Sequence, residues 1–388
     1  MIITNASAFI DGRFTPSDLL IRDERIFEIH PASAQNFTYI FNDERINLHG
    51  AKLYPGFIDL QINGCGGIIY NDDTSTERIS YMRDINFKSG TTTFLPTLVT
   101  TSDKNIAAAA DQMFEYHRGH GRYNVPGIHI EGPFISERKS GIHNKKYIRH
   151  FTDENLEFFL ANQEQIAMLT LSVEQFTEEQ LRILAECGIT MSIGHSSCTY
   201  DECIGYLGNN NFIRNATHLY NAMTVLSGGR NPGVAEAVFD SGIYAGIIAD
   251  LCHVHPALIR SARKILGDHL YLVTDALASA GAPEGFCSFR FCDKQLYVRE
   301  NGFCADENGT LGGSSLTMNM GIKNLIQTCG ISEKDAIEMA TVIPARAINM
   351  DRDLGSIKTG KIASFTVLDD NYDCMMTISQ GKVVFQKK

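Results

Sequence analysis

Glu131, His195, His218 and Asp275 are the residues of this chain whose types suit hydrolytic chemistry. They occur in the segments HIEGPF, SIGHSS, ATHLYNAM and LVTDA, each at or just after the end of a short apolar run. One carboxylate and two imidazoles make a three-ligand site that suits a catalytic zinc ion and leaves a position open for water. Zinc lowers the pKa of that water to about 7, and Asp275 could then accept a proton and return it to a leaving group.

Each of these residues also has an ordinary structural interpretation. A single histidine at the end of a strand is more often a hydrogen-bonded structural residue than a metal ligand. Glu131 alone could cap the following turn, and Asp275 alone could cap the next helix. Only the placement of all four residues at one site favours the metal-dependent interpretation, so the elements that position them decide the question.

Eight apolar, strand-like runs recur through the middle of the chain, separated by helix-like segments. Residues 152–163 and 177–188 are typical helices, and the second begins at a Thr177 cap and ends at Gly188. Eight strands that alternate with helices predict a (β/α)8 TIM barrel, an α/β fold. A doubly wound sheet is the alternative, but no G-x-G-x-x-G motif follows any run. The runs span residues 57–63, 91–99, 125–132, 166–174, 189–196, 211–220, 244–251 and 270–276.

Polar or ionisable residues stand at the end of nearly every predicted strand. In a barrel the carboxyl ends of the strands converge on one mouth, where the active sites of this fold lie. Gln61 and Asn63, at the end of the first run, alternate with apolar residues and therefore share one face of the strand. We expect both amide side chains to face the mouth, beside the four ionisable residues.

The two ends of the chain have a different texture. Residues 1–54 and the tail from residue 352 read as short strands and turns, with Asp11-Gly12 and Asp23-Glu24 as tight connections. We expect a small sheet assembled from both termini. The chain then divides into a β-rich domain of residues 1–54 and 352–388 and a barrel domain of residues 55–351.

The composition narrows the class of partner. The 388-residue chain has a net charge of -11, so nucleic acids and acidic membranes would be repelled over most of its surface. An anionic small substrate would need a local basic pocket. The most apolar stretch, residues 242–251, is too short to span a membrane. The N-terminus shows no secretory signal and the ten cysteines form no C-x-x-C pair, so we expect reduced thiols and a cytoplasmic location.

The order of motifs along the chain resembles that of a known family. HIEGPF, GIHN, SIGHS, THLYNAM, GRNPG, LVTDA and LGGSSLTM are similar to the motifs of the N-acetylglucosamine-6-phosphate deacetylases of the amidohydrolase superfamily, and the resemblance covers essentially the whole chain. It implies a barrel with a small β-sandwich domain and a bound divalent metal ion. It also implies release of acetate from N-acetyl-D-glucosamine 6-phosphate, and a homodimer whose active sites borrow residues across the interface.

The resemblance assigns roles to individual residues. Glu131, His195 and His218 match the metal ligands, and Asp275 matches the general acid and base. His143, in GIHN, matches a catalytic histidine near the acetamide carbonyl. The positions that match substrate-binding residues are His143, Asn221, Ala222, Arg230 and His253, and Arg230 and His253 are expected to act either in their own subunit or across the dimer.

One departure concerns the number of metal ions. Most amidohydrolases carry His-x-His at the end of the first strand, where this chain has Gln61-x-Asn63. Amide side chains are weak zinc ligands, so we predict one divalent ion per subunit, with zinc expected and iron, cobalt or manganese as alternatives. Gln61 and Asn63 then lie behind the ligands, where Gln61 could orient the water on the metal.

Two other functions compete with this interpretation. The first is deacetylation of a related sugar phosphate such as N-acetylgalactosamine 6-phosphate, which differs at one hydroxyl. The second is a non-catalytic scaffold that keeps the barrel for assembly. A scaffold would have no need of Glu131, His195, His218 and Asp275 together.

Overall fold

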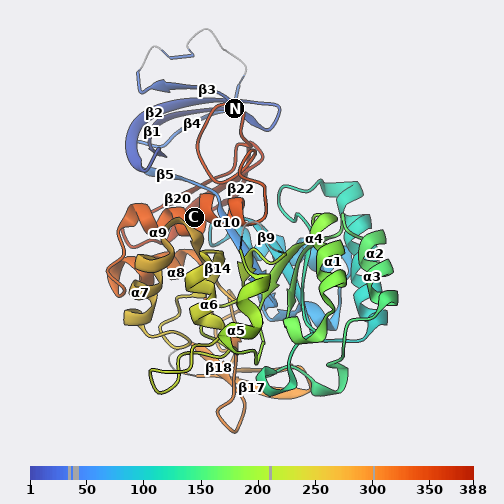
Figure 1. The fold of residues 1–388 in the computed structure, drawn as a ribbon. Helices are drawn as coiled ribbons and strands as arrows, with labels where there is room; N and C mark the ends of the chain where they lie inside the picture. The colour runs from blue at the N-terminus through green and yellow to red at the C-terminus, as the bar shows by residue number, and fades with distance from the viewer. Residues whose placement is uncertain (34–35, 38–42, 209–211, 300–301) are drawn as a thin grey trace.

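The computed structural model describes residues 1–33, 36–37, 43–208, 212–299 and 302–388. Eight strands, paired in parallel in chain order, form a nearly closed barrel with helices around it (Figure 1). The predicted (β/α)8 barrel is therefore confirmed. The barrel strands are β6 (Phe57–Ile62), β9 (Thr91–Val99), β10 (Ile128–Glu131), β11 (Ile166–Leu171), β12 (Thr190–Ile193), β13 (Asn215–Ala216), β14 (Tyr244–Ile248) and β15 (Leu270–Val273).

Each predicted run contains one of these strands, but most strands end earlier than the runs. β12 ends at Ile193 and β13 at Ala216, two residues before His195 and His218. The polar residues that close the runs therefore lie mostly in the first positions of loops. Residue 211, where the sixth run was predicted to begin, lies outside the described residues.

A short seam joins the first and last strands of the barrel. Ile62 and Ala276 form an isolated parallel bridge. Asp59 of β6 is buried and accepts hydrogen bonds from Thr274, the residue after β15, through its backbone N–H at 3.2 Å and its hydroxyl at 2.5 Å. A carboxyl side chain thus contributes to barrel closure.

Two helices begin at threonine caps, of which the Thr177 cap was predicted from the sequence. The hydroxyls of Thr152 and Thr177 accept from the N–H groups of Asn155 and Gln180, and both termini are capping boxes. No helix among the described residues is both long and apolar enough to cross a membrane. The α-helices are α1 (Thr76–Phe87), α2 (Asp103–His120), α3 (Asp153–Ala161), α4 (Glu178–Glu186), α5 (Tyr200–Cys203), α6 (Val234–Ser241), α7 (Pro256–Leu266), α8 (Met318–Gln327), α9 (Glu333–Ala340) and α10 (Val342–Ala347), and the 3-10 turns are η1 (Tyr70–Asp72), η2 (Glu137–Lys139), η3 (Lys145–Tyr147), η4 (Val173–Gln175), η5 (Ile204–Tyr206) and η6 (Gly267–His269).

The two ends of the chain form one eight-stranded sheet at one end of the barrel (Figure 1). Its order is β22-β21-β20-β5-β1-β2-β3, with β4 beside β1. Its own apolar cluster includes Ile3 and Ile21 from the N-terminal segment and Phe365 and Ile378 from the tail, so both termini are needed to build it. The strands are β1 (Ile2–Ile10), β2 (Arg13–Arg22), β3 (Arg25–Pro31), β4 (Arg45–Asn47), β5 (Lys52–Pro55), β20 (Phe365–Leu368), β21 (Cys374–Ser379) and β22 (Lys382–Gln386).

A third sheet, antiparallel and not predicted from the sequence, lies at the opposite end of the barrel (Figure 1). It consists of β16 (Ser288–Phe291), β17 (Lys294–Val298), β18 (Phe303–Ala305) and β19 (Leu311–Ser314). A bridge between Ala276 and Ser314 joins β19 to the chain just beyond β15. This sheet therefore lies beside the carboxyl ends of the barrel strands, as does the short pair β7 (Gly64–Cys65) and β8 (Ile68–Ile69) after β6.

Candidate active site

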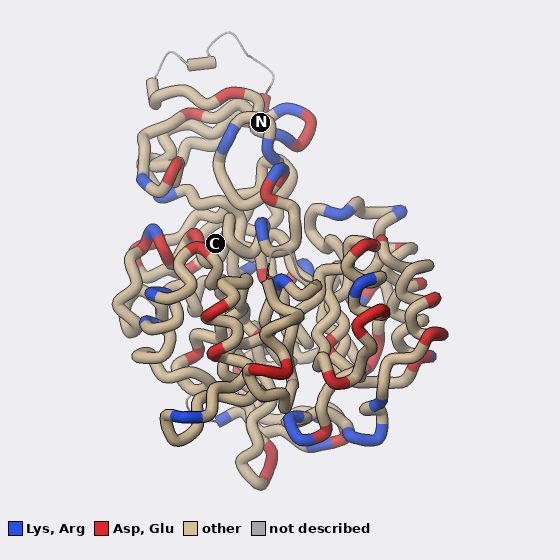
Figure 2. The backbone as a smooth tube through the Cα atoms, in the orientation of Figure 1, with Lys and Arg blue, Asp and Glu red and all other residues tan. Residues whose placement is uncertain are grey.

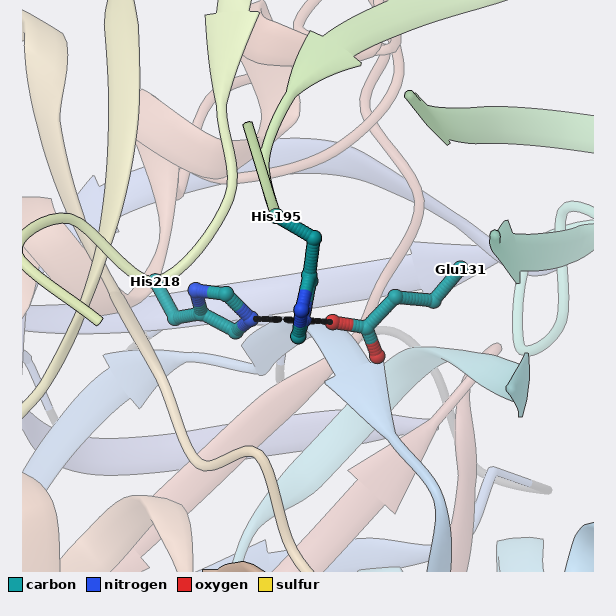
Figure 3. Close-up of side chains that lie close together, drawn as sticks. All are labelled: Glu131, His195 and His218. Carbon is teal, nitrogen blue, oxygen red and sulfur yellow. Dashed lines mark hydrogen bonds and ion pairs between the residues drawn. The ribbon is translucent and has the colours of Figure 1, made fainter. Parts of the chain in front are cut away.

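Three side chains, those of Glu131, His195 and His218, come together at the barrel mouth. Nε2 of His218 lies 2.9 Å from Oε1 of Glu131, Nε2 of His195 lies 3.1 Å from the same oxygen, and the two nitrogens are 3.1 Å apart (Figure 3). All three side chains are buried. A tetrahedral zinc ion with bonds of about 2.0 Å separates its ligands by about 3.3 Å, so this group fits a divalent cation.

The backbone is strained at three of the four ionisable residues of the site. His195, His218 and Asp275 have φ angles of +49°, +32° and +49°, in the left-handed region that residues other than glycine seldom adopt. Each follows the end of its barrel strand by two residues, where the chain turns out of the barrel. Such conformations persist only where surrounding contacts hold them, and they concentrate at functional sites.

The ring of His195 is held from behind by the segment that follows β10. Nδ1 donates to the carbonyl of Lys139 at 2.8 Å, and the N–H of Ser136 donates to the carbonyl of His195 at 2.9 Å. With its proton on Nδ1, the ring presents the lone pair of Nε2 to Glu131 and His218, as a metal ligand requires. Nδ1 of His218 is buried, and no described group bonds to it.

Glu131 keeps a negative charge in a buried place. Burial opposes its ionisation, but the neighbouring imidazoles of His195 and His218 outweigh burial and hold the pKa of Glu131 well below its usual value. Burial likewise opposes the charged form of His218, yet the hydrogen bond and charge of Glu131 raise the pKa of that imidazole. A buried carboxylate of this kind requires compensating positive charge, which a dication supplies.

Asp275 faces the same cavity and is held through one of its oxygens. Nδ2 of Asn63 donates to Oδ1 of Asp275 at 2.6 Å, and Nε2 of Gln61 donates to the same oxygen at 3.2 Å. Within the described parts of the chain no hydrogen bond engages Oδ2, so this oxygen is free to exchange a proton. Burial, reinforced by the charge of Glu131, raises the pKa of Asp275 to about 7. A carboxyl group with such a pKa can both accept and donate a proton near neutrality.

The LGGSS segment packs its backbone against Asp275. A Cβ atom at Gly313 would lie 2.2 Å from the carbonyl oxygen of Asp275, so only glycine allows this approach. The N–H of Ser314 donates to the same carbonyl at 2.8 Å. These contacts fix the strained turn after β15.

A polar layer, which was not predicted from the sequence, lies inside the barrel beneath the site. His129, two residues before Glu131, bonds through Nε2 to the hydroxyl of Thr170 at 2.7 Å and through Nδ1 to the carbonyl of Leu60 at 3.0 Å. Burial lowers the pKa of His129 to about 4, so this ring is neutral at pH 7. His129 could have been identified from the sequence, because side chains alternate along a strand and His129 therefore shares a face with Glu131.

The four residues open into a cavity of about 390 Å³. His143 lines it, with Nδ1 2.7 Å from the hydroxyl oxygen of Thr100 and its ring 4.3 Å from the ring of His195. Burial, reinforced by His195, lowers the pKa of His143 to about 3, so the ring is neutral at pH 7. Asn63, Asn221 and Ala222 also line the cavity, whereas Gln61 lies behind it.

Two of the residues matched to substrate binding are placed differently from the others. Arg230 is exposed and does not line the cavity of its own chain. His253 lines the cavity, but Nδ1 lies 2.6 Å from Oδ2 of Asp250 and Nε2 lies 2.9 Å from the carbonyl oxygen of Gly312. The carbonyl of Gly312 can only accept a hydrogen bond. Asp250 also accepts, because His253 holds the pKa of this carboxyl below its usual value in spite of burial, so it is ionised. Both ring nitrogens therefore donate within the protein.

Arg138 and Lys139 of η2 line the cavity and were not singled out in the sequence. Nζ of Lys139 donates to the carbonyl of Met223 at 2.9 Å. The sequence feature that could have indicated them is the basic stretch ERKSGIHNKKYIR around the GIHN motif.

Glu174, which closes the fourth predicted run, accepts from the backbone N–H of Ser197 at 2.9 Å and so anchors the loop after His195.

A larger groove, of about 850 Å³, lies between the small sheet and the barrel and contains none of these residues. Its charged side chains are largely solvated, and Arg25 there pairs with Asp353 at 2.7 Å. Buried ionisable residues, among them Glu131, His143 and Asp275, gather around the smaller cavity instead. We therefore take the smaller cavity as the candidate active site.

A barrel whose strand ends carry a buried Glu-His-His group and a carboxyl group defines a class of enzyme, the barrel hydrolases that work with a divalent cation. The chain belongs to the amidohydrolase family, whose model matches residues 53–387.

Within this family the chain is similar to sugar-phosphate deacetylases. It is 43% identical to the N-acetylglucosamine-6-phosphate deacetylase of Haemophilus influenzae over 87% of each chain. It is 34% identical to the N-acetylgalactosamine-6-phosphate deacetylase of a Shewanella species, over 87% of this chain and 84% of that protein. The crystal structure of N-acetylglucosamine-6-phosphate deacetylase from Pasteurella multocida matches with a TM-score of 0.92 at 39% identity, over 98% of both chains.

Proposed function

We propose that the protein hydrolyses the acetamide of N-acetyl-D-glucosamine 6-phosphate to give D-glucosamine 6-phosphate and acetate. The observation that carries the proposal is the meeting of the Glu131-His195-His218 group and the unbonded oxygen of Asp275 in one cavity. Similarity to deacetylases over most of the chain supports the choice of substrate. A non-catalytic scaffold would not require this convergence.

Glu131, His195 and His218 hold one divalent ion per subunit, and zinc suits their mixture of one oxygen and two nitrogen donors. When bound, the ion supplies the Lewis acidity that activates a water molecule and polarises the acetamide carbonyl. The amides of Asn63 and Gln61 donate hydrogen bonds to Asp275 and are therefore not directed at a second ion. This supports one metal ion per chain.

Asp275 is the general base and then the general acid. Its Oδ2 accepts a proton from the attacking water and delivers it to the nitrogen of the departing amine, while Asn63 and Gln61 keep Oδ1 in place. A pKa near 7 supports both transfers. His143, neutral at pH 7, donates an N–H to the carbonyl oxygen as negative charge develops there.

The phosphate is bound at the rim of the cavity. Asn221, Ala222 and Arg230 are the proposed direct contacts with the substrate, and His253 is the fourth proposed binding residue. The backbone N–H of Ala222 donates to no described residue, so it is a suitable donor to the phosphate. His253 acts through Gly312, since both of its ring nitrogens are engaged.

Arg230 reaches the cavity of a second subunit in a homodimer. It lies in a loop that also exposes Val225 and Leu226, with 43% and 52% of their surface accessible. Adjacent exposed apolar side chains at the mouth support an interface there.

The proposal extends to the organisation and location of the chain. Residues 1–54 and 352–388 form one unit, supported by their own apolar cluster, and residues 55–351 form the catalytic unit. A cytoplasmic location is supported by ten free cysteines.

Acetate release from N-acetylglucosamine 6-phosphate, measured with and without a chelator, tests the proposal. We expect release that the chelator abolishes and added zinc restores.

The second candidate substrate is N-acetylgalactosamine 6-phosphate, favoured by the 34% identity to the Shewanella enzyme. A kcat/KM at least tenfold higher for the galactose epimer would favour that candidate.

A further inference from the structure

We propose that Arg138 is a phosphate-binding residue of this site, supplied by the same chain that supplies the metal ligands. The inference rests on the proposed function and adds a residue that determines the preference for phosphorylated sugars. Its first support is position, because Arg138 lines the cavity with Glu131 and Asp275, whereas Arg230 of the same chain does not.

The guanidinium of Arg138 is available to a ligand. It is exposed, and no hydrogen bond or ion pair joins it to any residue that the structure describes. Lys139, the other long cationic side chain that lines the cavity, already donates to the carbonyl of Met223. Arg138 therefore keeps all of its N–H donors for a molecule that enters the cavity.

The backbone that carries Arg138 is fixed relative to the reacting centre. Ser136 donates its N–H to the carbonyl of His195 at 2.9 Å, and the carbonyl of Lys139 accepts from Nδ1 of the same histidine at 2.8 Å. One proposed metal ligand thus holds the chain on both sides of Arg138. The arginine side chain starts from a defined point beside the site.

The charge distribution calls for a cation at this position. The chain carries a net charge of -11, so an anionic substrate meets repulsion over most of the surface on its way to the cavity. Figure 2 shows lysines and arginines gathered on the chain at the end of the barrel where β17 and β18 lie. Residues 137–149 contribute five such residues, Arg138, Lys139, Lys145, Lys146 and Arg149.

The chemistry of the substrate matches this geometry. The acetamide on C2 and the phosphate on C6 project from different sides of the sugar ring. When the acetamide reaches Glu131 and Asp275, the phosphate therefore stays toward the rim, where Arg138 lies. A guanidinium presents a planar pair of donors that matches two phosphate oxygens.

Kinetics of the zinc-loaded full chain on N-acetylglucosamine 6-phosphate and on unphosphorylated N-acetylglucosamine test the role of Arg138. The quantity to compare is the ratio of the two kcat/KM values. We expect Arg138→Gln to lower this ratio roughly 10- to 100-fold, since a hydrogen bond to a charged group has that effect on binding. Arg138→Lys should have a ratio between those of Arg138→Gln and the wild type, because lysine keeps the positive charge but lacks the paired donors of the guanidinium.

Lys145→Gln is the matched control. It removes the same charge from the same exposed rim, but Lys145 does not line the cavity, so the ratio should change less than about twofold. An unchanged ratio in Arg138→Gln, or an equal loss in Lys145→Gln, would overturn the proposal.

Binding separates this inference from the proposed function. If the wild-type chain released no acetate from the phosphosugar, the proposed function would fail while calorimetry with glucosamine 6-phosphate would still test Arg138. Weaker binding to Arg138→Gln than to the wild type would support the assignment. Equal affinity would contradict it.

Discussion

Nδ2 of Asn63 lies 2.6 Å from Oδ1 of Asp275, and this hydrogen bond ties the end of the first barrel strand to the end of the last. Gln61 donates to the same oxygen at 3.2 Å. The two amides that stand where most amidohydrolases carry His-x-His are therefore directed at a carboxyl group. This arrangement leaves Oδ2 of Asp275 without a hydrogen bond to any residue that the structure describes.

Asn63→Ala should raise the pKa of Asp275. The amide hydrogen bond favours the ionised carboxylate, so its loss shifts the acid limb of the kcat profile to higher pH, by roughly 1 unit. Gln61→Ala, which removes the longer of the two bonds, should produce a smaller shift. An acid limb that stays in place, or moves to lower pH, in Asn63→Ala would show that this hydrogen bond does not tune Asp275.

Asp275→Asn should abolish most turnover without unfolding the protein. The amide keeps the size of the side chain but cannot accept and return a proton, so kcat should fall at least ~100-fold. Elemental analysis should find the same metal content as in the wild type, because Asp275 is not one of the three proposed ligands. Near-normal kcat in a metal-replete Asp275→Asn protein would refute the acid and base role.

Ionisation of the buried Asp59 carboxyl should make the protein less stable as the pH rises. Burial raises its pKa from 3.8 to about 7, against the effect of the hydrogen bonds from Thr274 and Gln61. A carboxyl whose folded-state pKa is raised contributes stability that is complete below about pH 4 and is lost as the pH rises through about 7. Between pH 5 and pH 8 the wild type should therefore lose about 2 to 3 kcal/mol of unfolding free energy that Asp59→Asn does not lose.

Urea unfolding of both proteins at pH 5 and pH 8 measures this difference. Asn at position 59 resembles the protonated acid, because its amide can donate to the Thr274 hydroxyl. Asp111→Asn, which removes a charge from an exposed position of α2, is the control and should show no such pH dependence. Parallel pH dependence in the wild type and Asp59→Asn would mean that Asp59 is ionised throughout this range.

Gly313→Ala should damage the site through the backbone. Its Cβ would lie 2.2 Å from the carbonyl oxygen of Asp275, so either the turn or β19 must move. We expect at least a ~10-fold loss of kcat, since small displacements of a catalytic group are costly. Gly119→Ala is the control: its Cβ meets no atom within 4 Å in α2, so activity should be kept. Full activity in Gly313→Ala would show that this close contact is dispensable.

The barrel was predictable because its determinants are local. Each strand lies within a strand-like run of the sequence, and the carboxyl ends of parallel strands meet at one mouth, so the meeting of Glu131, His195, His218 and Asp275 followed from topology. The small sheet at the termini followed from turn residues such as Asp11 and Asp23, which adopt positive φ in the structure.

Other features depend on contacts between distant segments and left no pattern in the sequence. The strands β16 to β19 are three to five residues long, and polar residues interrupt their apolar positions. The hydrogen bond from Asn63 to Asp275 spans 212 residues, and His253 meets Gly312 across 59 residues. Side-chain direction at such positions is set by tertiary packing, which residue type alone does not specify.

Titration of metal-free protein with zinc tests the central claim most directly. We predict that acetate release from N-acetylglucosamine 6-phosphate, absent at the start, rises linearly and reaches a plateau at one equivalent per chain, and that Glu131→Gln binds the ion far more weakly. Full acetate release before any zinc is added, or a plateau at two equivalents, would contradict a single ion held by Glu131, His195 and His218.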